Sequence, residues 1–192
     1  MLTCRMKILL ALILACAALS AGAEPQRYAL QPTASTVGFE TDFGPDKITG
    51  QMPVTQADLQ LDFKNLGAST VVVTLDVTGA QASFPFAAQA MKGPKVLDSQ
   101  EFPTITFQST AVRGTTDAAE IAGTMTIRGV ARAAVLHATL FRPHGSQPTD
   151  LSLLTIHLTG AVLRSDFGAV GWSDMVGDQV RLDIVAQIAR VK

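Results

Sequence analysis

Apolar and polar residues alternate with a period of two along most of the chain after residue 35. In the segment 179–188, apolar residues occupy every even position and polar residues occupy most of the odd ones. The same alternation recurs over 58–63, 70–78 and 120–128. Because successive side chains of a strand point to opposite faces, alternation of this length predicts half-buried antiparallel strands.

Turn-forming residues separate these runs. We predict connections at Gly44–Asp46, Asn65–Gly67, Gly114–Asp117 and Gly177–Asp178, and a longer loop from His144 to Asp150. About eight to ten strands at this spacing indicate an all-β sandwich or barrel. The sequence contains no linker, low-complexity tract or clear internal repeat that would divide it further.

The segment from Ser83 to Pro103 interrupts the strand pattern. Residues 87–92 predict one or two helical turns, which Gly93 and Pro94 end. Long connections inside β domains often serve as lids or binding loops. This one carries apolar side chains that either plug the end of a barrel or contact a ligand: Phe84, Phe86, Met91, Val96, Leu97 and Phe102.

The first 23 residues have the pattern of a secretory signal peptide. Arg5 and Lys7 precede an apolar run from Ile8 to Leu19, and Ala21–Ala23 is a small-x-small cleavage site. That run is shorter than the ~20 residues a membrane-spanning helix needs. The sequence therefore predicts export and a mature domain over 24–192. Lipoprotein processing at Cys16 is the alternative.

Charge and cysteine content bear on possible partners and on how the mature domain is stabilised. Without Arg5 and Lys7 the mature part has 15 − 2 = 13 basic and 16 acidic side chains, a formal charge of −3. This balance does not favour nucleic acid as a partner. Both cysteines, Cys4 and Cys16, lie in the signal segment, so the core has to stabilise the mature domain without disulfides.

Residues that carry chemistry do not form a recognisable constellation. The histidines, at 137, 144 and 157, lack metal-ligand spacing, and we expect His157 to face solvent on a strand. Ser165 has no assignable base, and we expect Arg164 and Asp166 to form a structural ion pair near a barrel rim. The sequence thus predicts no catalytic residue, metal site or cofactor.

Four blocks resemble the YceI-like family of bacterial periplasmic proteins. They are Ser35–Phe39 with Ile48–Gly50 and Leu61–Phe63, then Leu97–Ser109 with its F-P-T-I-T-F-Q-S run, Gly123–Val130, and Leu163–Gly168 followed by Val176–Val180. The similarity covers 28–188. It departs from the family pattern at Ala133, where many members have proline, and over 84–96, which lacks an Arg-Asp-rich stretch.

The resemblance implies an eight-stranded antiparallel lipocalin-like barrel, with the short helical segment as a lid. It implies a periplasmic protein that binds a long-chain isoprenoid, an isoprenoid quinone or a fatty amphiphile without acting on it, and it allows a homodimer. Phe167, Trp172 and Met175 lie in a Gly-rich segment that we expect to line one end, although Trp172 is also explained by packing at the rim. The candidate ligand-binding residues are Phe39, Phe84, Phe86, Met91, Leu97, Phe102, Ile105, Phe107, Met125, Ile127, Leu136, Ile156, Leu158, Phe167, Trp172 and Met175.

Two other functions stay open at this point. One is an enzyme that modifies such a lipid through Arg164, Asp166 or His157. The other is an accessory module that binds a membrane electron-transfer complex, which predicts an exposed apolar patch outside the barrel.

Overall fold

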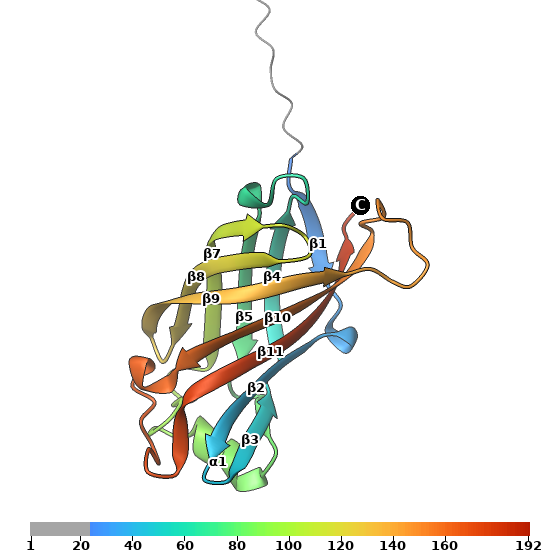
Figure 1. The fold of residues 1–192 in the computed structure, drawn as a ribbon. Helices are drawn as coiled ribbons and strands as arrows, with labels where there is room; N and C mark the ends of the chain where they lie inside the picture. The colour runs from blue at the N-terminus through green and yellow to red at the C-terminus, as the bar shows by residue number, and fades with distance from the viewer. Residues whose placement is uncertain (1–23) are drawn as a thin grey trace, which may run out of the picture.

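The computed structural model describes residues 24–192, and the predicted signal peptide with its alternative at Cys16 lies outside the described residues. Strands make up most of the regular structure in this part of the chain (Figure 1). The strands are β1 (Gln26–Leu30), β2 (Thr36–Phe43), β3 (Asp46–Gln51), β4 (Val54–Leu61), β5 (Thr70–Asp76), β6 (Gln81–Ala82), β7 (Thr104–Gly114), β8 (Ala119–Ile127), β9 (Val130–Phe141), β10 (Leu153–Leu163) and β11 (Val176–Arg190). One α-helix, α1 (Pro85–Lys92), and three short 3₁₀ turns, at Pro32–Ala34, Leu66–Ala68 and Arg164–Phe167, complete the described elements.

Eight of the strands close into an antiparallel barrel. They follow the order β1-β4-β5-β7-β8-β9-β10-β11, and β1 pairs with both β4 and β11. Closure leaves no free edge in this ring, which protects an all-β protein from edge-to-edge association. The prediction of an eight-stranded barrel is confirmed.

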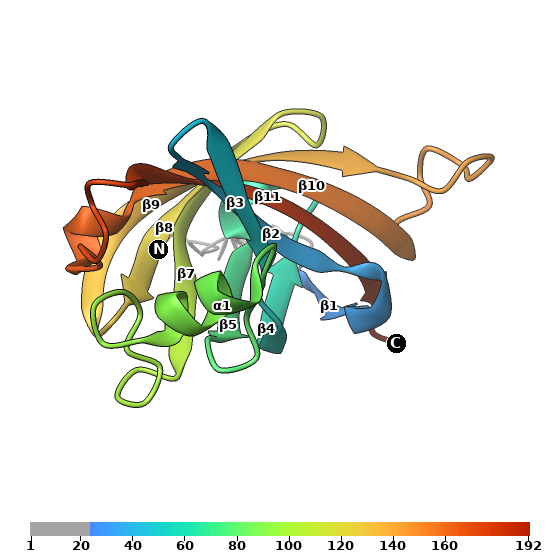
Figure 2. The ribbon, with the colours of Figure 1, turned by 90° about the horizontal axis from the view of Figure 1, so that it is seen from below.

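Strand β11 extends the barrel at one end. Its last residues pair with β1, whereas Val176–Val185 pair with β2, and β3 and β6 continue the sheet from there. The connection between β5 and β7 lies across this end of the barrel and carries α1 (Figure 2). Helix α1 begins two residues earlier than predicted, because proline is well tolerated in a first helical turn, and ends at Gly93 as expected.

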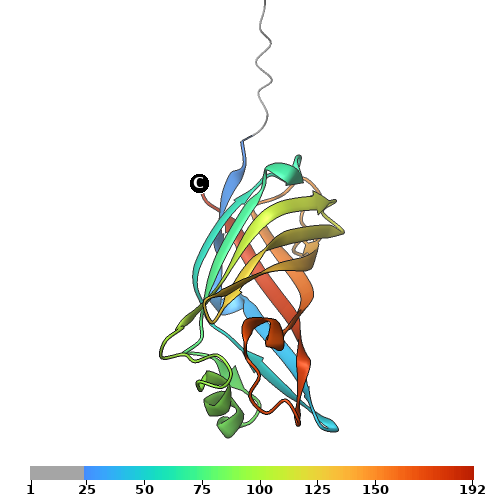
Figure 3. The ribbon, with the colours of Figure 1, turned by 90° about the vertical axis from the view of Figure 1, so that its left-hand side faces the viewer.

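Close packing fills the opposite end. Leu154 and Ile188 are fully buried there, with Leu59, Leu61 and Leu140 around them. The Tyr28 ring meets Phe63 edge-on at 5.6 Å, and its hydroxyl donates to the carbonyl of Leu151 at 2.9 Å. Burial raises the pKa of Tyr28. The two ends of the described chain lie at this end of the barrel (Figures 1 and 3).

Most of the predicted connections are confirmed. Turns at Gly44–Asp46, Asn65–Gly67 and Gly114–Asp117 and the loop from His144 to Asp150 separate consecutive strands. The connection predicted at Gly177–Asp178 is wrong. These residues form a bulge inside β11, where the pairs Val176–Phe43 and Val180–Thr41 place three residues of β11 opposite one of β2. None of the helices within residues 24–192 has the length and hydropathy to span a bilayer.

Candidate functional site

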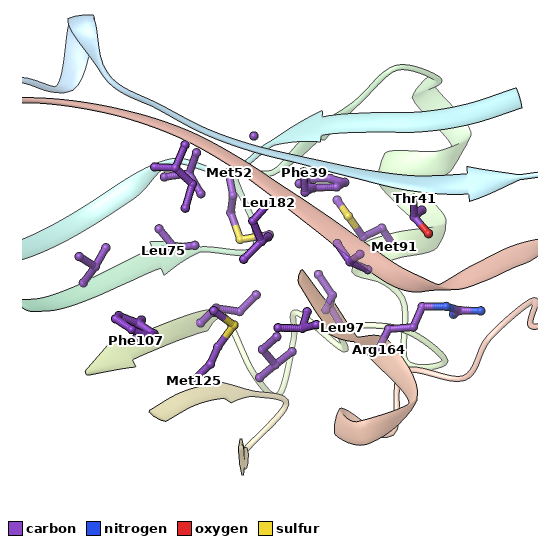
Figure 4. A pocket seen from close by; sticks show the side chains of 18 of the residues that line it. Phe39, Thr41, Met52, Leu75, Met91, Leu97, Phe107, Met125, Arg164 and Leu182 are labelled. Carbon is purple, nitrogen blue, oxygen red and sulfur yellow. The ribbon is translucent and has the colours of Figure 1, made fainter. Parts of the chain in front are cut away.

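The barrel encloses an apolar cavity of about 440 Å³. It is lined by 42 residues, contributed by barrel strands, by β2 and β3, by α1 and by the two irregular segments that flank the open end. Phe107 and Met125 approach its centre from β7 and β8, Leu182 from β11, and Met91 and Leu97 from the segment around α1 (Figure 4). The period-two pattern produces this wall directly, because every second side chain of each strand faces the interior.

Polar side chains are nearly absent from the wall. Thr41, Arg164 and Trp172 are the only lining residues with a side-chain nitrogen or oxygen. The hydroxyl of Thr41 donates to the carbonyls of Gly177 and Gln179, at 3.1 and 3.0 Å. The wall therefore offers apolar contact and shape to an occupant, without a cluster of polar groups.

The wall is not filled evenly. On β8 and β9 the inward side chains are buried, as at Ile121, Met125 and Leu136, whereas on β5 and on β11 before Ile188 they stay half-exposed. Val73, Leu75, Leu182 and Ile184 point inward yet remain accessible. Side chains of β5 and β11 therefore border vacant volume.

The cavity opens at the end that carries α1. Three lining residues are exposed, Phe86 by 65%, Met175 by 49% and Trp172 by 41%, and all three belong to α1 or the connection before β11. Every other lining residue is buried or half-buried. The far end is closed by the cluster around Leu154 and Ile188, so the opening beside α1 connects the cavity with the outside.

Arg164 organises the segment beside this opening. Its Nε donates to the carbonyl of Gly177, Nη1 to those of Ala169 and Gly171, and Nη2 to that of Val176, all at 2.7–3.0 Å. Burial lowers the pKa of the guanidinium, and the nearby Asp178 carboxylate partly opposes this effect. In Figure 4 the guanidinium points away from the apolar side chains at the centre of the cavity.

The expected ion pair between Arg164 and Asp166 is wrong. Asp166 is exposed, and among residues 24–192 no salt bridge reaches it. The carboxylate that holds this turn is Asp178, which accepts from the Ser165 amide at 2.9 Å and from its hydroxyl at 2.7 Å. These bonds lower the pKa of Asp178. Ser165 thus serves as an anchor of the turn before β11.

His157 lies on the outside of the barrel. Its neighbours Ile156 and Leu158 line the cavity, so its ring points outward, where Nε2 lies 2.5 Å from Oδ1 of Asp183. His137 is exposed on β9, and His144 is exposed in the loop after it. Over residues 24–192 no three His, Cys, Asp or Glu side chains gather in a way that could hold a metal ion.

The candidate ligand-binding residues fall into two groups. Fourteen of the sixteen line the cavity: Phe39, Phe86, Met91, Leu97, Ile105, Phe107, Met125, Ile127, Leu136, Ile156, Leu158, Phe167, Trp172 and Met175. Phe84 and Phe102 lie outside this wall, and ligand contact by these two stays a prediction. Phe84 stacks on Phe86 at 6.0 Å, and the Phe102 ring packs over Gly129 in the turn between β8 and β9.

Several lining residues are absent from the candidate set. They come mainly from β2, β3, β4, β5 and β11 and include Val37, Phe43, Ile48, Met52, Leu59, Leu61, Val71, Val73, Leu75, Val180, Leu182 and Ile184. Their signal is present in the sequence, because most of them occupy the apolar positions of the alternating runs. Extending the candidate set to every inward position would have found them.

Several solved structures share this architecture. The structure resembles BcnA of Burkholderia cenocepacia, with a TM-score of 0.74 and 17% identity over 84% of this chain and 99% of that one. It also resembles a YCEI protein of Campylobacter jejuni, with a TM-score of 0.59 and 21% identity over 74% and 84% of the two chains. A polyisoprenoid binding domain from Saccharophagus degradans has a TM-score of 0.61 and 11% identity over 86% and 99%. No curated protein matches the chain significantly.

These identities are low, so the solved structures establish the shared fold alone. The sequence itself matches the family model described as the YceI-like domain over residues 28–188, almost the whole of the described chain. The closed barrel, its apolar interior and this match agree, and the chain belongs to the YceI-like family.

Proposed function

We propose that this protein binds the hydrocarbon chain of an isoprenoid or similar long-chain lipid in its barrel and carries it in the periplasm without chemical change. The observation that carries the proposal is the composition of the cavity wall. Of 42 lining residues, the two with hydroxyl or charged side chains, Thr41 and Arg164, direct their hydrogen bonds to backbone carbonyls.

The energetics of burial support a ligand of this kind. Burying one five-carbon isoprene unit contributes on the order of 3–4 kcal/mol before the costs of association. Those costs are about 4–15 kcal/mol, so several units held together give tight binding without a hydrogen bond. The resemblance to the Saccharophagus degradans polyisoprenoid binding domain agrees with this ligand class.

The predicted signal segment over 1–23 and the family support a location in the periplasm. We infer that the chain is exported and cleaved after Ala23, with processing at Cys16 as the alternative. Mass spectrometry of the protein recovered from the cell envelope distinguishes the two outcomes, because only the second leaves a lipid-modified cysteine at the N-terminus.

The arrangement of polar side chains does not favour a lipid-modifying enzyme. Arg164 holds four backbone carbonyls, Asp166 is exposed, and His157 faces outward from β10. Within residues 24–192, no hydrogen bond or salt bridge joins any two of these three side chains. A reaction would require at least two of them at one reacting atom.

Calorimetric titration of the purified protein with farnesol, a short isoprenoid alcohol, tests the binding proposal. We expect saturable binding with a negative heat-capacity change, the signature of apolar burial. Native mass spectrometry of the same preparation should detect a co-purifying apolar compound. A preparation that carries no lipid and gives no farnesol binding after delipidation contradicts the proposal.

A further inference from the structure

Exposed apolar side chains are concentrated around the mouth of the cavity. Five of the eleven exposed large hydrophobic residues in the described chain belong to two short segments, 84–86 and 170–175. Phe86 and Val170 are the most exposed, at 65% and 58%. The other six are distributed over the barrel wall and the C-terminal end. A cluster of this kind in a folded protein indicates a contact surface.

The segments that carry these side chains form one continuous rim. The amide of Gly44, in the turn between β2 and β3, donates to the carbonyl of Met175 at 3.1 Å. Gly171 donates to Lys95, just after α1, at 2.8 Å, and Ser83, just before α1, donates to Thr49 of β3 at 2.7 Å. Figures 1 and 2 place these segments together at one end of the barrel.

Continuity between rim and cavity identifies what this surface contacts. Phe86, Trp172 and Met175 are at once exposed on the rim and part of the cavity wall. A long-chain lipid resides in a bilayer, and its transfer through water would expose its whole hydrocarbon surface. An apolar rim set into the bilayer interface gives the chain an apolar path from membrane to cavity.

Charges near the rim are of both signs. Lys47, Lys92 and Lys95 lie on the rim segments, and so do Asp46 and Asp174. Such a rim lacks the basic cluster with which proteins bind anionic lipid headgroups. Tryptophan, in contrast, is a residue of the membrane–water interface, and the single tryptophan of this chain is on the rim.

We propose that the rim formed by residues 84–86 and 170–175 docks onto a lipid bilayer through apolar contact, so that the cavity mouth opens into the membrane. The proposal rests on the proposed lipid-binding function and adds where and how the lipid enters. Docking driven by apolar contact does not require anionic lipid and persists at high salt.

The test uses vesicles of pure phosphatidylcholine and the native fluorescence of Trp172. We expect the protein to sediment with the vesicles and its emission to shift to the blue, with little change when salt is raised to about 0.5 M. Emission that does not shift, or binding that is lost in salt or requires anionic lipid, contradicts docking of this kind.

Phe84 and Val170 separate docking from ligand binding, because both are exposed on the rim and neither lines the cavity. We expect the double variant Phe84→Asp/Val170→Asp to reduce vesicle binding at least about tenfold, since a carboxylate is costly in the bilayer. The matched control, Phe141→Asp/Val135→Asp, adds the same charge at exposed apolar positions of β9 and should bind vesicles as before. Val170→Asp alone serves as a second variant, because the Val170 side chain is largely free of packing.

Farnesol binding without vesicles distinguishes the two proposals. If the rim variant still binds farnesol but neither sediments with vesicles nor extracts lipid from them, docking is supported. If the wild-type protein binds farnesol but stays free of vesicles, or if both double variants lose vesicle binding equally, the docking proposal is wrong and the lipid-binding proposal survives. A wild-type protein that instead self-associates through Phe84 and Val170 assigns the rim to a protein contact and overturns docking.

Discussion

Two glycines show how single residues shape the barrel wall. Gly50 lies beneath the ring of Phe39, and Gly123 lies beneath the ring of Phe107. A Cβ added at Gly123 would lie 2.5 Å from Cζ of Phe107 and 2.6 Å from the Gln108 carbonyl oxygen. Glycine inside a strand often marks a position that a neighbouring group covers closely. Here it lets the tip of a large ring approach the strand backbone closely.

Replacement of Gly123 by alanine should therefore destabilise the fold. We expect Gly123→Ala to lower the free energy of unfolding by about 1–3 kcal/mol, because the methyl group forces the Phe107 ring and the strand backbone to shift. Urea denaturation measures the change. Gly67→Ala is the control, since the nearest atom to its added Cβ is 3.5 Å away, and it should stay within about 0.5 kcal/mol of wild type. Equal stability of the two variants would contradict this account.

Local structure beside the cavity mouth depends on Arg164. Its guanidinium accounts for one hydrogen bond each at Ala169, Gly171, Gly177 and Val176, and so fixes the connection that forms part of the cavity mouth. Substitution by methionine keeps much of the side-chain volume but leaves these carbonyls without their donor. A buried polar group left unsatisfied costs about 1–3 kcal/mol.

We therefore expect Arg164→Met to destabilise the protein by at least about 2 kcal/mol and to accelerate amide hydrogen exchange over 169–177. Differential scanning calorimetry and hydrogen-exchange mass spectrometry measure the two effects. Arg132→Met is a suitable comparison, because the Arg132 guanidinium bonds only the neighbouring Ala131 carbonyl. Unchanged protection of 169–177 in Arg164→Met would show that the guanidinium does not hold this connection.

At the scale of elements, the outer face of β11 carries an ionic ladder across to β2 and β3. Arg181 of β11 pairs with Glu40 and Asp42 of β2, and Glu40 also pairs with Lys47 of β3 at 2.7 Å. Hydrogen bonds from Lys47 and Arg181 lower the pKa of Glu40, and a hydrogen bond from Arg181 lowers that of Asp42. Its bonds to Asp42 and Glu40 raise the pKa of Arg181. Opposite charges on adjacent strands favour this register.

The lowered pKa values of Glu40 and Asp42 determine how the stability of the protein depends on pH. A carboxyl whose pKa is lower in the folded state contributes stability that is fully present above its unfolded pKa, about 4, and is lost as pH falls through the folded pKa. We expect the free energy of unfolding to decrease between about pH 5 and pH 2, and Arg181→Met to make this decrease smaller. Urea denaturation at several pH values measures the slope, with Arg132→Met as the control. The same slope in Arg181→Met and wild type would exclude the ladder as a source of the pH dependence.

At the scale of the whole molecule, function depends on how much of the interior is left vacant. Inward side chains of the barrel strands, such as Met125 of β8, Leu75 of β5 and Leu182 of β11, border this vacant space. Packed interiors leave few voids larger than a water molecule, so a cavity of about 440 Å³ is a specific feature of this barrel. The cavity is closed at the end around Leu154 and open at the end around α1, so its two ends differ.

Filling this space should abolish binding without removing the fold. Ala186 lines the cavity on β11, and we expect Ala186→Phe to weaken farnesol binding at least about tenfold, because the ring takes the place of part of the ligand. Stability should change little, since the ring enters vacant volume. The control is Ala133→Phe, which places the same ring on the exposed outer face of β9. Calorimetric titration gives both affinities, and equal affinities would place the ligand elsewhere.

Local elements were predictable from the sequence, whereas contacts between distant segments were not. The strands at the four alternating runs, most turns and the helical segment were predicted correctly because period-two alternation and turn residues act locally. Gly177–Asp178 was misread as a turn, since a bulge and a turn use the same residues and differ only in what pairs across from them. The partners of Arg164 were not predictable either, because they are carbonyls of an irregular segment without periodicity.

By itself, the sequence determined that the chain forms antiparallel strands with one apolar face, because alternating side chains can be buried only on a shared side. Whether those faces meet as a solid core or surround a vacancy was decided by the tertiary structure. The number and tilt of the strands set the enclosed volume, and the side chains fill only part of it. The same closure turned Phe84 and Phe102 away from the interior and brought residues 84–86 and 170–175, far apart in the chain, onto one rim.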